Sequence, residues 1–241
     1  LSQGRVNVRN MQFYGLGCNG ATAGSGILSL SSCVAEVSNT HFDGCMAPSS
    51  GVLNLLDSHG AIVRNTEFFD YGNWNGIGHS KTLGAYAWIR ATAPTALNGR
   101  NTKSILIDQC NFDEGGTSRA TYIDGYQWAE IVRSTANIGS GKGYCFKDSV
   151  HAIVRNSWAG YSGATTHIGV EADGVSLLEL DRIKFEAQVE QVDIIGTTKR
   201  VILRDCSRGT SPILSLILNN PANAEVVTPV ETVKLNRIIP I

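Results

Sequence analysis

The sequence predicts an all-β protein whose chain winds as a parallel β-helix, and three observations lead to this prediction. A short phrase recurs eight times, first as Val8-Arg9-Asn10 and last as Leu203-Arg204-Asp205. The residue two places before the third member of each phrase is aliphatic in every copy, and a phenylalanine stands three places after that member in five copies. These third members, named anchors below, are Asn10, Asn39, Asn65, Gln109, Ser134, Asn156, Arg182 and Asp205.

Each repeat contains two apolar segments that are too short for helices. The segment around each anchor alternates apolar and polar residues, as in Ile107 to Phe112, which is the period of a β-strand. A second apolar run precedes each anchor, for example Val52 to Leu56 and Ile168 to Val170. Without a ten-residue helical pattern between these runs, βαβ units are excluded. The predicted coil is therefore strand, turn, strand, turn, with neighbouring coils about 4.8 Å apart.

Stacked coils place equivalent residues on top of one another, so the two apolar columns should face the interior. The predicted aliphatic ladder is Val8, Val37, Val63, Ile107, Val132, Val154, Leu180 and Leu203. The predicted aromatic ladder is Phe13, Phe42, Phe68, Phe112 and Phe185. The anchor asparagines suit tight corners, where Asn tolerates left-handed backbone angles, and we prefer this structural interpretation to a catalytic one.

The 241 residues are predicted to form one elongated domain with an irregular end. Residues 1–220 form the predicted β-helix. The spacing of 44 residues between Asn65 and Gln109 exceeds the other spacings, which indicates a long loop insertion at about residues 71–103. Residues 221–241 contain three prolines among short apolar pieces, and we interpret this segment as a cap or an association segment.

Charge and hydropathy exclude two classes of partner. The net charge of −1 argues against nucleic acid, because no basic excess is present to displace phosphate counterions. No apolar stretch reaches 18 residues, so no membrane insertion is expected. One predicted outward column holds Arg9, Arg64, Arg133, Arg155 and Arg204. We interpret this column as a solvated face that could also meet an anionic polymer.

The six cysteines lack the CxxC spacing of a zinc site, and we expect no metal and no cofactor. Cys110 and Cys206 share a column but lie too many coils apart to form a disulfide. Buried thiols in a chain that folds in a reducing cytosol are therefore the preferred interpretation.

Aromatic residues provide the candidates for substrate contact. The insertion carries Trp74 and His79 among Gly, Asn and Tyr, a composition suited to stacking on sugar rings or to contacting another protein. The full candidate set for substrate binding is Trp74, His79, Trp88, Tyr122 and Trp128. The alternative is that these side chains pack against neighbouring coils and are covered.

Two carboxylates, Asp124 and Glu171, are the candidate catalytic residues. Glycoside hydrolysis needs two such groups on one face, about 5 to 9.5 Å apart. The two residues stand ten and eleven places before their anchors, so they occupy nearly equivalent positions two coils apart. Acidic residues at strand ends are more commonly solvated than catalytic, and this alternative stays open.

The repeated phrase resembles that of a known architecture. Val37-Ser38-Asn39-Thr40-His41-Phe42-Asp43-Gly44 is similar to the coils of the right-handed parallel β-helices shared by pectate-lyase-like carbohydrate enzymes and bacteriophage tailspikes. The resemblance covers about residues 5 to 220 and implies a right-handed helix of about eight to nine coils. Of the polygalacturonase motifs, Arg182-Ile183-Lys184 is present and the Asp-Asp pair is missing, so a phage tailspike or tail-fibre segment is the better match.

The resemblance implies a virion protein that folds in the host cytoplasm and associates as a homotrimer with other virion tail proteins. Its expected ligand is bacterial surface polysaccharide, which such proteins bind for host attachment and in some cases depolymerise. A non-catalytic structural or adhesive β-helix of a virion or cell-surface fibre is the alternative function.

Overall fold

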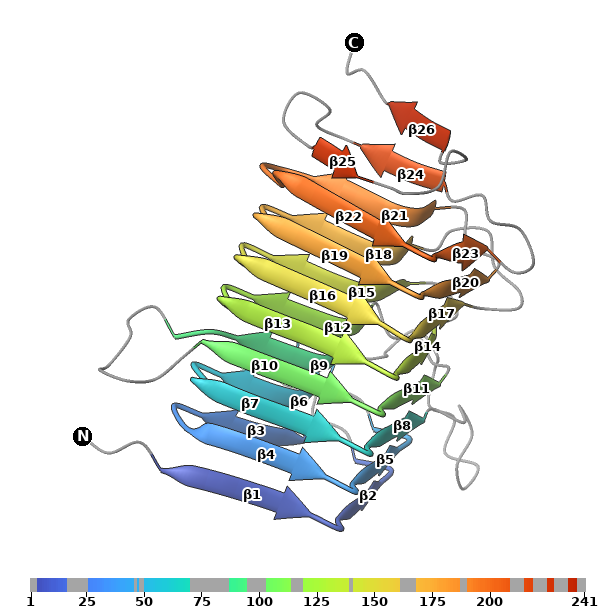
Figure 1. The fold of residues 1–241 in the computed structure, drawn as a ribbon. Helices are drawn as coiled ribbons and strands as arrows, with labels where there is room; N and C mark the ends of the chain where they lie inside the picture. Colours follow the sequence, from blue (N-terminus) through green and yellow to red (C-terminus); the bar gives the residue numbers. More distant parts are fainter. Residues whose placement is uncertain are drawn as a thin grey trace.

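The fold is a parallel β-solenoid with three strands in each coil. The computed structural model describes residues 4–16, 26–45, 47, 50–69, 87–94, 103–113, 119–138, 141–160, 168–186, 190–208, 215–218, 225–227 and 234–237. All of its strand pairs are parallel, and successive coils stack along one axis from the N-terminal to the C-terminal end (Figure 1). Within the described residues no helix is long and apolar enough to cross a membrane.

The strands form three sheets, named A, B and C in the order in which the chain enters them. Sheet A contains β1 (Arg5–Arg9), β4 (Val34–Ser38), β7 (Gly60–Arg64), β10 (Ser104–Asp108), β13 (Trp128–Val132), β16 (His151–Arg155), β19 (Leu177–Asp181), β22 (Arg200–Arg204) and β25 (Glu225–Val227). Sheet B contains β2 (Gln12–Tyr14), β5 (His41–Asp43), β8 (Glu67–Phe69), β11 (Asn111–Asp113), β14 (Thr135–Asn137), β17 (Trp158–Gly160), β20 (Lys184–Glu186) and β23 (Ser207–Arg208). Sheet C contains β3 (Leu28–Ser31), β6 (Gly51–Leu56), β9 (Ala87–Thr92), β12 (Arg119–Asp124), β15 (Lys142–Lys147), β18 (Ile168–Asp173), β21 (Glu190–Ile195), β24 (Ser215–Leu218) and β26 (Lys234–Arg237).

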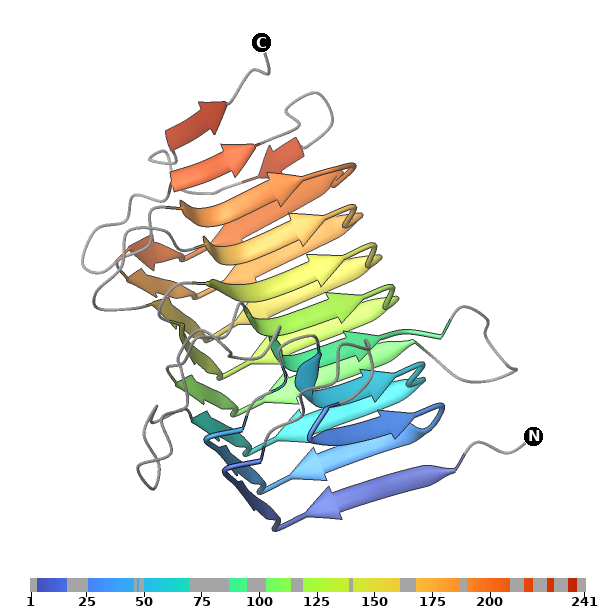
Figure 2. The ribbon, with the colours of Figure 1, turned by 180° about the vertical axis from the view of Figure 1, so that it is seen from behind.

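Sheets A and C form the two long faces of the solenoid, and the short strands of sheet B close one side (Figures 1 and 2). The segment after residue 220 contributes β25 to sheet A and β26 to sheet C, so the stacking continues there. Strand β9 lies inside the expected insertion, between residues 71–86 and 95–102, which are outside the described residues.

The sequence predicted two strands in each coil, and the third arises from a sharp bend at the anchor. Asn10, Asn39, Asn65 and Asn156 all have φ between 48° and 56°, which is the left-handed region. Backbone in this region cannot continue a strand, so the anchor segment is divided into a sheet A strand and a sheet B strand.

Asparagine side chains at this corner form hydrogen bonds to one another from coil to coil. The Nδ2 atom of Asn39 donates a hydrogen bond to Oδ1 of Asn10 at 3.3 Å, and Asn65 donates to Asn39 at the same distance. The residue after the anchor is buried at Thr40, Thr66 and Ser157, and the hydroxyls of Thr66 and Ser157 donate to the carbonyl two residues earlier, at 3.0 and 2.9 Å. The structural interpretation of the anchor asparagines is therefore confirmed.

The interior is built from the two predicted ladders. The rings of Phe13, Phe42, Phe68 and Phe112 stack with centroid distances of 4.8, 5.0 and 5.1 Å. Ala136 and Ala159 continue this column. Beside them Tyr144 of sheet C is fully buried, with its hydroxyl 2.9 Å from the carbonyl oxygens of Ser134 and Trp158. An aromatic ring from a different sheet thus accompanies the smaller side chains.

The aliphatic ladder is confirmed except at one coil. Six of its eight predicted members are buried, and Val8 in the first coil is partly exposed. Val132 was predicted wrongly, because Ile107 pairs with Ile131, which is fully buried, while Val132 points outward. The corresponding anchor is Arg133, with a φ of 50°, and not Ser134. Arg133 therefore also leaves the predicted outward arginine column, where Val132 stands in its place.

The five described cysteines are buried and form no disulfide with one another; Cys18 lies outside the described residues. Burial raises the pKa of Cys110 to about 12 and that of Cys206 to about 11. A thiol with such a pKa stays protonated at neutral pH and is a poor nucleophile.

The corrected register predicts a large loss of stability for one substitution and a small loss for the substitution next to it. Ile131→Ala should lower the free energy of unfolding by about 2 to 5 kcal/mol, because it removes buried methyl groups from the ladder. Val132→Ala, on the outer face, should lower it by less than about 1 kcal/mol. Equilibrium unfolding in denaturant checks both, and a larger loss for Val132→Ala would contradict the register.

Candidate functional site

The outer face of sheet A carries three columns of side chains, since alternate residues of each strand point away from the core. Along the strand direction the first column is Arg5, Val34, Gly60, Ser104, Trp128, His151, Leu177 and Arg200. The middle column is Asn7, Glu36, Ile62, Leu106, Glu130, Ile153, Glu179 and Ile202. The third column is Arg9, Ser38, Arg64, Asp108, Val132, Arg155, Asp181 and Arg204.

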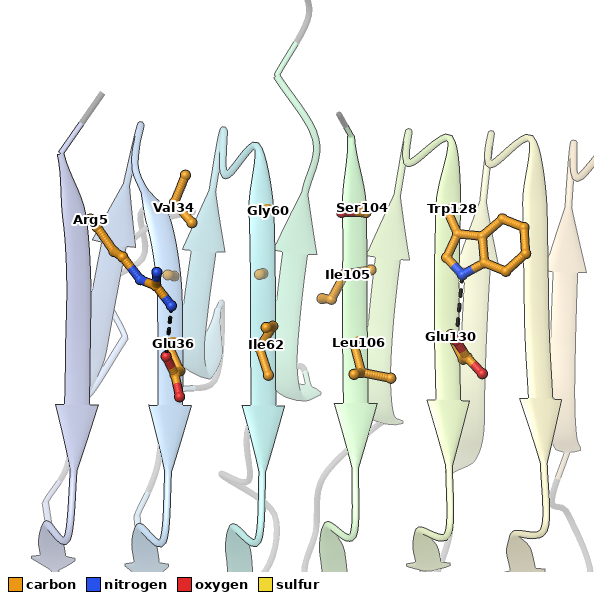
Figure 3. A pocket seen from close by; sticks show the side chains of 12 residues that line it. Arg5, Val34, Glu36, Gly60, Ile62, Ser104, Ile105, Leu106, Trp128 and Glu130 are labelled. Atoms are coloured by element: carbon orange, nitrogen blue, oxygen red, sulfur yellow. Dashed lines mark hydrogen bonds and ion pairs between the residues drawn. The ribbon is translucent and has the colours of Figure 1, made fainter. Parts of the chain in front are cut away.

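A groove of about 280 Å³ crosses this face over β1, β4, β7, β10 and β13. The groove is hollow where the first column holds Gly60, which has no side chain, and Ser104, whose side chain is too short to fill the space (Figure 3). Its apolar floor comes from the half-buried side chains of Val34, Ile62 and Leu106. Small residues between larger ones thus create a depression on an otherwise regular sheet.

One end of the groove is occupied by a carboxylate that three arginines share. Glu36 has a side chain only 4% exposed, and Arg5 and Arg9 each approach it at 3.0 Å. Arg64 on the next strand also bonds to Glu36. Burial acts to raise the pKa of Glu36, but the hydrogen bonds from the three guanidinium groups outweigh burial and lower that pKa. We name these four residues the arginine cluster.

Trp128 stands at the other end of the groove (Figure 3). Trp128 is 43% exposed, which is unusual for so large a side chain. The ring of His151 packs edge-on against it with a centroid distance of 4.5 Å, and the indole Nε1 lies 3.5 Å from Glu130. Glu130 in turn pairs with Arg155 of the next strand. The indole is therefore held in place at one edge while a large part of it stays open to solvent.

The two predicted carboxylates lie on the outer face of sheet C, on the other long side of the solenoid. Asp124 is in register with Lys147 and Asp173, whereas Glu171 is in register with Cys145. The expected equivalence of Asp124 and Glu171 is therefore offset by two residues. Two strand spacings and a two-residue offset separate their backbones by about 12 Å, and Asp173 stands about 9.6 Å from Asp124 in its own column.

The surroundings of the two carboxylates differ. Burial raises the pKa of Asp124 above its ordinary value; Lys147 and Arg90 oppose this effect, and Asp148 and Asp173 add to it. Glu171 is only 7% exposed and forms an ion pair with Lys142. Asp124 is thus the more accessible group, and a raised pKa is the property required of a general acid.

The predicted aromatic residues are dispersed. Trp88 is fully buried, with its ring 5.8 Å from that of Phe68, so the core encloses it. Tyr122 is half-buried on sheet C, beneath the guanidinium of Arg119 at 5.6 Å. Trp74 and His79 lie outside the described residues. The structure therefore places Trp128 on a different face from Asp124, Glu171 and Tyr122.

Most of the groove was missed by reasoning from sequence. Glu36, Ile62 and Leu106 belong to one column, but recognising this from the sequence requires the exact register of three coils. One signal in the sequence could have indicated the hollow. In the first column, Gly60 and Ser104 are small residues that stand between the larger Val34 and Trp128.

Comparison with protein-family models, with curated proteins and with solved structures found no match to this chain.

The arginine cluster predicts a pH-dependent stability. Since the pKa of Glu36 in the folded chain lies below its ordinary value of 4.5, the cluster stabilises the fold above that value and ceases to do so as the pH falls through the lowered pKa. The parent should therefore exceed Glu36→Gln in free energy of unfolding at neutral pH, and this difference should shrink below pH 4.5.

Denaturant unfolding of both chains across this range checks the prediction. Glu186→Gln, which removes a more exposed carboxylate on sheet B, serves as the matched control and should show a smaller pH dependence. A difference for Glu36→Gln that stays constant from neutral to acidic pH would contradict the assigned role.

Proposed function

We propose that this chain is the β-helical part of a tailspike-like receptor-binding protein that holds host-surface polysaccharide in the groove of sheet A. The observation that carries the proposal is Trp128, an indole that is held at one edge and exposed at the end of a groove with an apolar floor. Sugar rings have apolar faces that stack on aromatic side chains, and their hydroxyls bond to charged groups at the rim.

The dimensions of the groove suit a polymer. From β1 to β13 the sheet spans four strand spacings, or about 19 Å, which accommodates several sugar rings in a row. Polar groups stand at both ends, with Arg5 and Glu36 at one and Glu130 at the other. Such an arrangement supports binding of a chain segment in preference to a single small molecule.

Virion location, a homotrimeric state and contact with other tail proteins belong to the same proposal. Their support is the resemblance of the repeated phrase to tailspike coils. Folding in a reducing host cytoplasm agrees with the burial of the five described cysteines and with their lack of disulfides to one another.

Depolymerisation is the second candidate activity, and the raised pKa of Asp124 favours it. In this activity a protonated Asp124 would donate its proton to the leaving oxygen, and a second carboxylate would activate water. The column position of Asp173 fits the second role at the spacing of an inverting enzyme, and Glu171 remains the candidate from the sequence.

Binding is tested with a panel of bacterial capsule and O-antigen polysaccharides. Trp128→Ala should weaken binding by at least about tenfold, because it removes the aromatic surface on which a sugar ring would stack at the end of the groove. Trp158→Ala, which alters a half-buried tryptophan on sheet B, is the matched control and should retain parental affinity. Equal affinity of the Trp128→Ala chain and the parent would exclude the groove as the binding site.

Cleavage is tested by chain-length analysis of the same polysaccharides. Where the parent shortens one of them, Asp124→Asn, Glu171→Gln and Asp173→Asn are compared, with Glu186→Gln as control. We expect at least one of the three variants to lose activity by a factor of about 100 or more, because a general acid or base has been removed. Full activity in all three would place catalysis elsewhere, and an inactive parent would favour the purely binding or structural function.

A further inference from the structure

The arginine cluster carries more positive than negative charge. Three guanidinium groups surround the single carboxylate of Glu36, which leaves a local excess of two positive charges. The side chains of Arg5, Arg9 and Arg64 are 63%, 52% and 48% exposed, so this excess faces solvent. The whole chain has a net charge of −1, and the excess is therefore a local property of this end of the groove.

Acidic groups elsewhere on the described part of sheet A are more evenly matched. Asp108 is paired with Arg133, and Glu130 with Arg155. Glu179 bonds to His151 at 2.9 Å and to Arg204 at 2.8 Å. The ratio of three arginines to one carboxylate over β1, β4 and β7 thus differs from the pattern on the rest of this face.

The guanidinium groups are also arranged to accept a second anion. Each of the three contacts Glu36 through Nη2, and a guanidinium carries five N–H donors. Because Glu36 is buried beneath them, it holds three long and flexible side chains in one place, which reduces the entropy lost when a ligand binds. Planar guanidinium groups recognise carboxylates through paired hydrogen bonds.

We infer that the groove selects acidic polysaccharides, and that Arg5, Arg9 and Arg64 recognise a carboxylate borne by a sugar of the bound chain. This inference rests on the proposed function and specifies its ligand. Glu36 and Trp128 lie on strands three spacings apart, or about 14 Å. One sugar cannot contact both, so the recognised unit is an oligosaccharide whose acidic residue is several ångströms from the stacked ring.

The test uses capsule polysaccharides that contain uronic acid, each compared with its own carboxyl-reduced derivative, which differs only in lacking the charge. We expect the parent protein to bind the acidic form more tightly at low ionic strength, and added salt to reduce this preference through screening. Arg9→Gln leaves two arginines on Glu36 and should lower affinity for the acidic form by about fivefold while affinity for the reduced form stays unchanged.

Arg204→Gln is the matched control, since Arg204 occupies the same column as Arg9 and Arg64 and also pairs with a glutamate of the middle column, but stands on β22, three strands beyond the groove. Arg204→Gln should leave the preference for the acidic form intact. Arg5→Gln is a second test variant, and thermal unfolding of each variant verifies that the fold persists.

The outcomes separate the inference from the function on which it rests. Equal binding of acidic and reduced polysaccharides, with loss of both in Trp128→Ala, overturns the acidic preference and leaves the proposed function standing. Binding of no polysaccharide, or binding that Trp128→Ala does not change, overturns both. An acidic preference that Arg204→Gln reduces as much as Arg9→Gln shows general charge attraction and overturns the assignment to the arginine cluster.

Discussion

Hydrogen bonding between parallel strands of successive coils sets the position of the side chains on the described strands. Each strand pairs with its equivalent in the next coil, so a residue lies directly over its counterpart about 4.8 Å away. Because side chains alternate along each strand, the whole column then faces either the interior or the surface. A shift of one residue in the pairing would exchange the two faces. The stacked phenylalanines and the asparagine corner both follow from this repetition.

Strand pairing also fixes the columns on the surface, but there the residue type need not repeat from coil to coil. Interior columns require apolar residues that together fill the core, whereas outward columns tolerate glycine, serine, tryptophan or charge at one strand without disturbing the next. Gly60 and Ser104 hollow the first column, and Trp128 ends the hollow. The arginine cluster arises likewise, because Arg5 of β1 and Arg64 of β7, which are 31 and 28 places from Glu36 in sequence, converge on this glutamate of β4. Binding features therefore result from departures from the repeat on a rigid scaffold.

The fold could be predicted from the sequence because its signal is repeated eight times. The aliphatic and phenylalanine columns identified a parallel β-helix, and the structure confirms a parallel β-solenoid. The error at the fifth repeat has a local cause, since Ile131 and Val132 are both aliphatic and either satisfies the column. The third strand was missed because the bend depends on a left-handed φ at the anchor, which asparagine permits but does not require.

The functional site was less accessible to such reasoning. Trp128 was identified as a binding candidate from its residue type, and its exposure supports that choice. Trp88 was chosen for the same reason, but it is fully buried and its ring packs against Phe68 in the core. The carboxylates Asp124 and Glu171 were matched by counting back from an anchor that was one residue wrong, and the structure separates their columns. The groove combines different residue types from several strands, so only the register of the folded chain brings Arg5, Glu36 and Trp128 to one groove.

Hydroxyl-radical footprinting of the protein with and without a bound polysaccharide tests whether the ligand lies in the groove of sheet A. This method reports the solvent exposure of each aromatic side chain. We expect bound polysaccharide to protect Trp128 on sheet A, while the reactivity of Trp158 on sheet B and of Tyr122 on sheet C is unchanged. Protection of Tyr122 with Trp128 still reactive would place the ligand on sheet C and contradict the assignment of the groove.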